Sequence, residues 1–136
     1  MIAFRSVPAG RDAKVALPLL DVYVDRAMTI PQTSLLDTGA RGVRLSAEIA
    51  RAVGVELPAE PNAPDVIVGG VRSQVHLVSH RLSVELDGRP VTWDAEVAFC
   101  APWPHPFGLL GMTGFFDAFD LVLQGRDERF ALTPRG

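Results

Sequence analysis

The sequence predicts one all-β domain over residues 1–136, a small barrel or sandwich with one or two short helices. Three observations support this prediction. Apolar and polar residues alternate with period two through most of the chain, as they do in half-buried strands. Two dipeptides typical of tight hairpin turns, Gly69-Gly70 and Asp87-Gly88, each lie between such alternating runs. Only one segment, which begins at Ser46, has the start and stop signals of a helix.

The first part of the chain holds two predicted strands and the helix. The run 14–24 alternates apolar and polar side chains, and a second run, 28–36, leads into Asp37-Thr38-Gly39-Ala40. The helix is predicted over 46–54, because a Ser suits the N-cap, a Glu suits the first turn and a Gly ends it. The proline-rich stretch 57–64 is predicted to be a loop.

The second part of the chain is predicted to contain two hairpins and a final strand pair. The glycine in each turn dipeptide supplies the positive φ that a two-residue hairpin turn needs. The predicted elements are, in order, strands 65–68 and 71–75 around Gly69-Gly70, strands 82–86 and 91–93 around Asp87-Gly88, a proline-rich loop 101–108, Leu109-Leu110-Gly111, a short turn or helical piece at 113–118, and strands 119–123 and 129–133.

Composition and charge exclude several classes of function. The 136 residues are 48% hydrophobic, which is enough for a sizeable core. Because 16 acidic side chains outnumber 13 basic ones, the net charge of −3 predicts no nucleic-acid partner. No apolar run reaches the ~18 residues that a membrane helix needs, and the N-terminus lacks the pattern of a signal peptide. We expect a soluble, cytoplasmic protein with no membrane partner.

Cysteine and histidine usage predicts neither a metal site nor a cofactor. Cys100 is the single cysteine, so no intrachain disulfide forms, and no Cys/His cluster has the spacing of a zinc site. His76 and His80 are four residues apart, but the residues around them alternate as in a strand, so we expect solvated strand histidines. A nucleophilic pair of Cys100 with His105 is disfavoured, because no third group would orient it.

One tripeptide has the chemistry of a catalytic site. Asp37-Thr38-Gly39 lies just beyond the apolar pair Leu35-Leu36 and is the only Asp-Ser/Thr-Gly in the chain. A strand that ends in a glycine-bearing turn holds a carboxylate at a rigid edge, where backbone N–H groups fix its orientation. The alternative is an Asx-type turn that only ends the strand.

Three segments, taken in order, resemble those of the retropepsin-like aspartic proteases. They are Leu35-Leu36-Asp37-Thr38-Gly39-Ala40, the Gly69-Gly70 hairpin and Leu109-Leu110-Gly111, with a helix between the first two. In that family these segments are the active-site loop, the flap over the substrate and a second loop that passes close by. The resemblance spans nearly the whole chain and implies a small closed barrel of retropepsin (acid protease) type with a flap hairpin.

The resemblance also implies an activity and an assembly. An aspartic endopeptidase hydrolyses peptide bonds with water activated by two carboxylates that share one proton, and it needs no cofactor. Only Asp37 lies in such a motif here; Asp117 and Asp120 lack a following Thr/Ser-Gly and are expected at the surface. A two-fold axis must therefore bring Asp37 together with its symmetry mate, which predicts an obligate homodimer.

Roles for individual residues follow from the same resemblance. Asp37, Thr38 and Gly39 are the expected catalytic residues: Thr38 would hydrogen-bond across the dimer, and Gly39 would let the backbone approach the carboxylate closely. The expected contacts to a peptide or protein substrate come from the motif's last residue and from the flap tip, namely Ala40, Gly69, Gly70 and Val71.

Two further expectations concern the ends of the chain and the proline-rich loop. Family members use their termini for dimerisation, so segments 2–4 and 130–132 are expected to form strands of a dimer sheet. In the proline-rich loop, Trp103 and His105 either contact substrate or simply cover the core.

Two alternatives to the protease stay open at this stage. The first is a catalytically silent module with the retropepsin fold that dimerises or binds peptide without cleaving it. The second is a plain β-barrel with a chance Asp-Thr-Gly, which could be a monomer. An open cleft with both Asp37 carboxylates facing one water molecule would distinguish the enzyme from the silent module.

Overall fold

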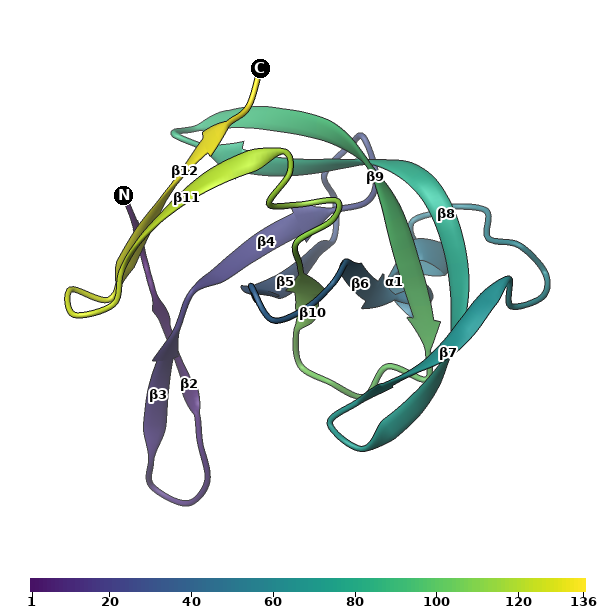
Figure 1. The fold of residues 1–136 in the computed structure, drawn as a ribbon, viewed down its shortest axis with the longest axis horizontal. Helices are drawn as coiled ribbons and strands as arrows, with labels where there is room; N and C mark the ends of the chain where they lie inside the picture. The colour runs from purple at the N-terminus through teal and green to yellow at the C-terminus, as the bar shows by residue number, and fades with distance from the viewer.

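The computed structural model describes residues 1–136 and consists of strands with one short helix (Figure 1). The helix is α1, Ala47–Ala52. The strands are β1 Ile2–Ala3, β2 Arg5–Pro8, β3 Lys14–Leu17, β4 Leu19–Tyr23, β5 Pro31–Leu36, β6 Val43–Ser46, β7 Ala63–Val68, β8 Val71–Leu86, β9 Arg89–Ala101, β10 Gly108–Leu110, β11 Phe119–Gln124 and β12 Arg129–Pro134. No helix is long and apolar enough to cross a membrane.

A closed, mixed barrel forms the body of the molecule. Strands β4, β5, β10, β6, β9 and β8 are hydrogen-bonded in that order, and the pair Tyr23↔Ser83 between β4 and β8 closes the ring. β7 pairs with the outer edge of β8. Fully buried side chains, among them Leu45, Leu82 and Phe99, fill the core. The predicted all-β class and closed barrel are therefore confirmed.

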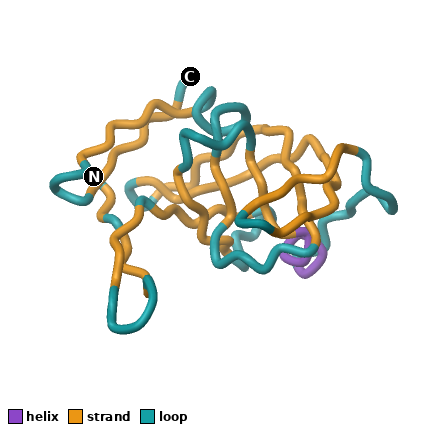
Figure 2. Tube along the Cα trace, turned by 60° about the horizontal axis from the view of Figure 1, so that its bottom comes forward, coloured by secondary structure: helices purple, strands orange, loops and turns teal.

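Local signals placed the helix correctly. The side chain of Ser46 accepts a hydrogen bond of 3.2 Å from the backbone N–H of Glu48, as an N-cap does. Ala47 and Ala50 are fully buried, so the helix attaches to the barrel by its small-residue face. Figure 2 shows the helix, in purple, against a body of strands. It ends at Ala52, two residues earlier than Gly54 had indicated.

Both predicted hairpin turns form, but the strands around them are longer than the sequence indicated. All four residues of the dipeptides Gly69-Gly70 and Asp87-Gly88 have positive φ, between 51° and 77°. The two short runs predicted at 71–75 and 82–86 are one strand, the 16-residue β8. It pairs with the 13-residue β9 without a register shift, from Gln74↔Ala101 to Leu86↔Arg89.

Two other segments differ from expectation. The run 14–24 is two strands, because Pro18 has no N–H to continue the ladder: β3 pairs with β2, and β4 with β5. The four residues of β6 were not predicted as a strand, and they pair with β9 and β10. The piece at 113–118, predicted as a short turn or a helical piece, is a series of turns.

The two ends of the chain pair with each other. β1 runs antiparallel to β12, with Ile2 opposite Phe130, and β11 completes a three-stranded sheet. The ring centroids of Phe4 and Phe130 are 6.3 Å apart. The terminal segments are thus strands, as expected. Within the single chain they pair with each other rather than with a second copy.

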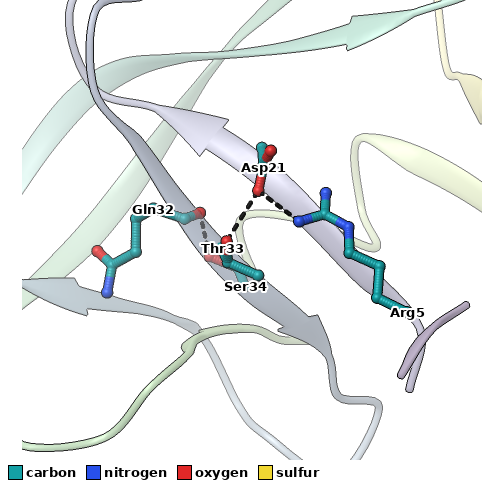
Figure 3. A network of polar contacts seen from close by, with 5 residues as sticks. All are labelled: Arg5, Asp21, Gln32, Thr33 and Ser34. Carbon is teal, nitrogen blue, oxygen red and sulfur yellow. Dashed lines mark hydrogen bonds and ion pairs between the residues drawn. The ribbon is translucent and has the colours of Figure 1, made fainter. Parts of the chain in front are cut away.

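A polar network fixes β5, the strand that leads to Asp37 (Figure 3). The carboxylate of Asp21 on β4 accepts hydrogen bonds from Thr33 on β5, at 2.9 Å, and from Arg5 on β2, at 3.0 Å. On the buried face of β5, Ser34 donates to the Gln32 carbonyl at 3.1 Å. The two bonds to Asp21 join the projecting β2–β3 hairpin and β5 to β4, and the Ser34 bond lies within β5.

Candidate active site

The Asp37 turn presents a carboxylate that the backbone holds in place. The N–H of Asp37 donates to the Leu110 carbonyl at 3.0 Å, and the N–H of Gly39 donates to Oδ1 of Asp37 at 2.9 Å. The second bond is an Asx turn, and it fits both the prediction that backbone N–H groups orient the carboxylate and the alternative of a turn that only ends the strand. Asp37 is half-buried, while Thr38 and Gly39 are exposed. The turn therefore faces solvent in the single chain.

The segment after β10 is hydrogen-bonded to the end of the Asp37 turn. β10 lies between β5, which it pairs with in parallel, and β6, which it pairs with antiparallel. Just beyond β10, the N–H of Met112 donates to the Ala40 carbonyl at 2.9 Å, and that of Thr113 donates to the Arg41 carbonyl at 2.8 Å. Leu109-Leu110-Gly111 thus passes directly behind Asp37-Thr38-Gly39-Ala40.

Gly111 allows the close approach of these two segments. A Cβ at this position would lie 2.5 Å from the carbonyl oxygens of both Ala40 and Gly42, closer than carbon and oxygen can pack. Ala40 itself is only 9% exposed, and its main chain is held on both sides. The position of the carboxylate therefore depends on the missing side chain at 111.

The predicted flap is the β7–β8 hairpin, and its tip lies on the proline-rich loop. A Cβ at Gly69 would be 3.2 Å from Cε1 of His105, and the ring centroids of His105 and Trp103 are 4.8 Å apart. On the same hairpin, Ser73 donates to the Pro102 carbonyl at 2.5 Å. The proline-rich loop thus contacts the flap hairpin at Gly69 and Ser73. Gly70 has no neighbour within 4 Å of its Cβ position.

The two flap glycines provide a matched test of this contact. Both have positive φ, so alanine at either position carries a similar backbone strain of about 1–2 kcal/mol. Only Gly69→Ala also crowds His105. We expect faster amide hydrogen exchange across residues 66–73 in Gly69→Ala than in Gly70→Ala. Equal exchange in the two variants would show that the contact with His105 contributes nothing.

Cys100 has the environment of a structural thiol rather than a nucleophile. It is fully buried, and its thiol lies 3.5 Å from the Ala98 carbonyl. Burial raises the pKa of the Cys100 thiol to about 11, and the nearby positive charge of Arg44 offsets this only in part. The disfavoured pairing with His105 therefore has no support.

Alkylation tests the state of Cys100. At pH 7.5 the folded protein is expected to take up no iodoacetamide over an hour, because the thiol is both protonated and inaccessible. In 6 M guanidinium the same sample should be labelled at one site, and intact-mass spectrometry reads both results. Labelling of the folded protein would show that the strand pair around Cys100 opens readily.

The strand histidines use their rings to bind backbone carbonyls. His76 Nδ1 lies 2.9 Å from the Pro58 carbonyl, and His80 Nε2 lies 2.6 Å from that of Val24. The expectation of solvated histidines is wrong for His76, which is 5% exposed, because residues before β7 fold over it. No group of three or more His, Cys, Asp or Glu side chains is placed to hold a metal ion.

The other two candidate carboxylates lie on the surface, as predicted. Asp117 accepts a hydrogen bond from the N–H of Gly114 at 3.0 Å, and Asp120 pairs with Arg135 at 3.5 Å. Both are exposed. Within one chain, Asp37 therefore has no carboxylate partner among the candidates that the sequence offered.

Sequence reasoning missed a pocket beside the Asp37 turn. A cavity of about 370 Å³ is lined by residues of the turn's continuation, including Arg41 and Arg44, and by β7, the outer strand of the flap. Its walls belong to five separate segments that only the folded topology brings together. The one sequence signal was the pair of arginines directly after the motif.

Comparison with known proteins supports the fold. No protein-family model and no curated protein matches the sequence. Among solved structures, a retropepsin-like aspartic protease from Rickettsia conorii is similar with a TM-score of 0.61 and 16% identity, over 98% of this chain and 97% of that one. EIAV protease, solved with the inhibitor HBY-793, matches 77% of this chain and 88% of its own at 19% identity and a TM-score of 0.42. The chain therefore has the retropepsin-like fold.

Proposed function

We propose that this chain is a homodimeric aspartic endopeptidase of the retropepsin-like family. The observation that supports it most is the Asp37 turn: an exposed loop, clamped between β5 and the segment after β10, in which the backbone orients one carboxylate oxygen. The fold adds support, since the similar chain from Rickettsia conorii is described as a retropepsin-like aspartic protease.

The proposed chemistry needs a second carboxylate, and a second copy of the chain supplies it. In a two-fold dimer, the Asp37 side chains of the two copies share one proton, because two carboxyl groups ~3 Å apart do not both ionise. The ionised carboxylate takes a proton from water, whose oxygen attacks the scissile carbonyl carbon. The protonated carboxylate donates to the carbonyl oxygen. As the C–N bond of the tetrahedral intermediate breaks, the carboxyl group that took the water proton gives it to the departing amine nitrogen. The other carboxylate takes a proton from a hydroxyl of the intermediate, so the pair again shares one proton.

The proposed substrate is an extended peptide between the Asp37 turn and the flap. Backbone groups at Gly69 and Gly70 would pair with it as an added strand, and Val71 and Ala40 would contact its side chains. Thr38, which is exposed and forms no side-chain hydrogen bond in the single chain, would bond across the dimer axis. The exposed turn would thus be covered by the partner copy and the substrate.

Two measurements together test the proposal. Sedimentation velocity across a range of concentrations is expected to show a dimer, and a broad peptide library digested between about pH 4 and 7 is expected to show cleavage. That pH range spans the titration of a carboxylate pair. A dimer that binds peptides without cutting them would favour the silent module. A monomer at all concentrations would contradict the proposed assembly.

A further inference from the structure

The pocket beside the Asp37 turn is lined by the residues that directly follow this turn and by residues of the flap hairpin. On one side are Arg41 and Gly42, which directly follow the turn, and on the other are Ala63 and Val66 of β7. Thr113, whose N–H is bonded to the Arg41 carbonyl, completes the rim. The pocket therefore spans from the catalytic turn to the outer strand of the flap, the two elements between which the substrate is proposed to lie.

The pocket contains two arginines with no partner in the protein. Arg44 is half-buried, yet its guanidinium forms no ion pair, and no hydrogen bond to a protein acceptor. Arg41 is exposed and equally unpaired, whereas Arg72 on the adjacent flap strand pairs with Asp65 at 3.7 Å. A guanidinium has five N–H donors, so a half-buried one without acceptors is ready to bind an anion.

One carboxylate also lines the pocket, but the net charge of the side chains around the pocket stays positive. Glu96 on β9 is exposed and forms no ion pair with either arginine. Its charge is therefore screened by solvent, whereas that of Arg44 belongs to a half-buried residue. Two positive charges against one negative charge favour an acidic group in the pocket.

The remaining walls are apolar. Val75 and Leu77 of β8 and Ala98 of β9 face the cavity, and they lie on the same outer face of the sheet as Arg44, whose register partner is Ala98. Apolar walls around a guanidinium suit a side chain with methylene groups and a terminal carboxylate. Glutamate has this shape, and aspartate has a shorter version of it.

We propose that this pocket is a specificity subsite that binds an acidic side chain of the substrate, preferably glutamate, with Arg44 as the main donor and Arg41 as the second. The inference rests on the proposed function, because it uses the path of a peptide from Asp37 to the flap. It names the substrate class: peptides with a glutamate a few residues from the scissile bond. A charge-assisted, two-pronged bond between Arg44 and the carboxylate provides the selectivity.

The test measures binding separately from cleavage. The full-length Asp37→Asn protein is titrated with fluorescent ten-residue peptides in which one Glu is moved through successive positions, each paired with its Gln counterpart. At one position we expect Glu to bind at least about 10-fold more tightly than Gln, as a hydrogen bond to a charged group provides. In the Arg44→Gln background this ratio should fall below about 3-fold.

Charge reversal and a distant arginine provide the controls. Arg44→Glu is expected to reverse the preference, so that Lys binds more tightly than Glu at the same position. Arg89→Gln, at an exposed site on the β8–β9 turn outside the pocket, should keep the wild-type ratio. Thermal melts confirm that each variant is folded, and Arg41→Gln stands in if either Arg44 variant is not.

The outcomes distinguish failure of the subsite proposal from failure of the proposed endopeptidase activity. No preference for Glu at any position, or the same ratio in Arg44→Gln and Arg89→Gln, overturns the subsite. Cleavage by the unmutated chain that ignores Glu also overturns it and leaves the proposed function intact. Arg44-dependent binding without any cleavage by the unmutated chain supports the subsite and contradicts the endopeptidase.

Discussion

Replacing Asp37 by Asn is expected to lower peptide hydrolysis by about 10³-fold or more while leaving the dimer intact. Asn occupies nearly the same volume and still accepts the hydrogen bond from the N–H of Gly39 through its side-chain oxygen. It cannot take a proton from water, so the general base is lost. Initial rates on a cleaved library peptide, together with sedimentation of the same sample, measure both properties.

Mixing the variant with the unmutated chain tests whether two copies share one site. If each active centre needs an Asp37 from both copies, a fully exchanged equal mixture should retain about a quarter of the activity, since only dimers with two intact chains work. Chains that act independently would retain about half. A Glu60→Gln variant, which changes an exposed carboxylate outside both the turn and the pocket, serves as the control for charge.

Gly111→Ala is expected to destabilise the fold by about 2–3 kcal/mol and to reduce activity as well. The new methyl group would lie 2.5 Å from two backbone oxygens, those of Ala40 and Gly42, neither of which is the end of a flexible side chain. The Asp37 turn must therefore move away from β10, and the carboxylate moves with it. Urea unfolding followed by circular dichroism measures the stability, and the library peptide measures the activity.

Gly125 provides the matched control for this substitution. No atom lies within 4 Å of its Cβ position, and its φ is not in the left-handed region, so Gly125→Ala should change stability by no more than about 0.5 kcal/mol. Equal stability of the Gly111 and Gly125 variants would mean that the two segments behind Asp37 separate at little cost.

Features encoded by neighbouring residues were predictable from the sequence. The cap at Ser46 and the turns at Gly69-Gly70 and Asp87-Gly88 depend on contacts within a few residues, and all three formed where expected. Strand lengths were not predictable in this way. β8 continues through His80 and Arg81, whose polarity broke the alternation, because its pairing with β9 stabilises the strand through that stretch.

The same distinction between local and long-range features applies to the candidate site. Asp37 stood out because its turn chemistry lies within three residues, and the Asx bond to Gly39 is part of that turn. The role of Gly111 behind Ala40 was only implied by resemblance, and the pocket around Arg44 was missed. Both depend on the parallel pairs β5–β10 and β6–β9, which join segments far apart in the chain.

β8 is one uninterrupted strand that links the predicted flap to the core of the barrel. One end of this strand, at Val71, begins at the hairpin tip, which lies against the proline-rich loop, and the other end carries Leu82 and Val84, both fully buried in the barrel. No loop lies between these two ends, so any opening of the predicted flap would bend the β8–β9 ribbon rather than turn about a hinge. Its stiffness is then set at the clamped end, and a cavity made at Val84 should soften a tip that lies thirteen residues away along the strand.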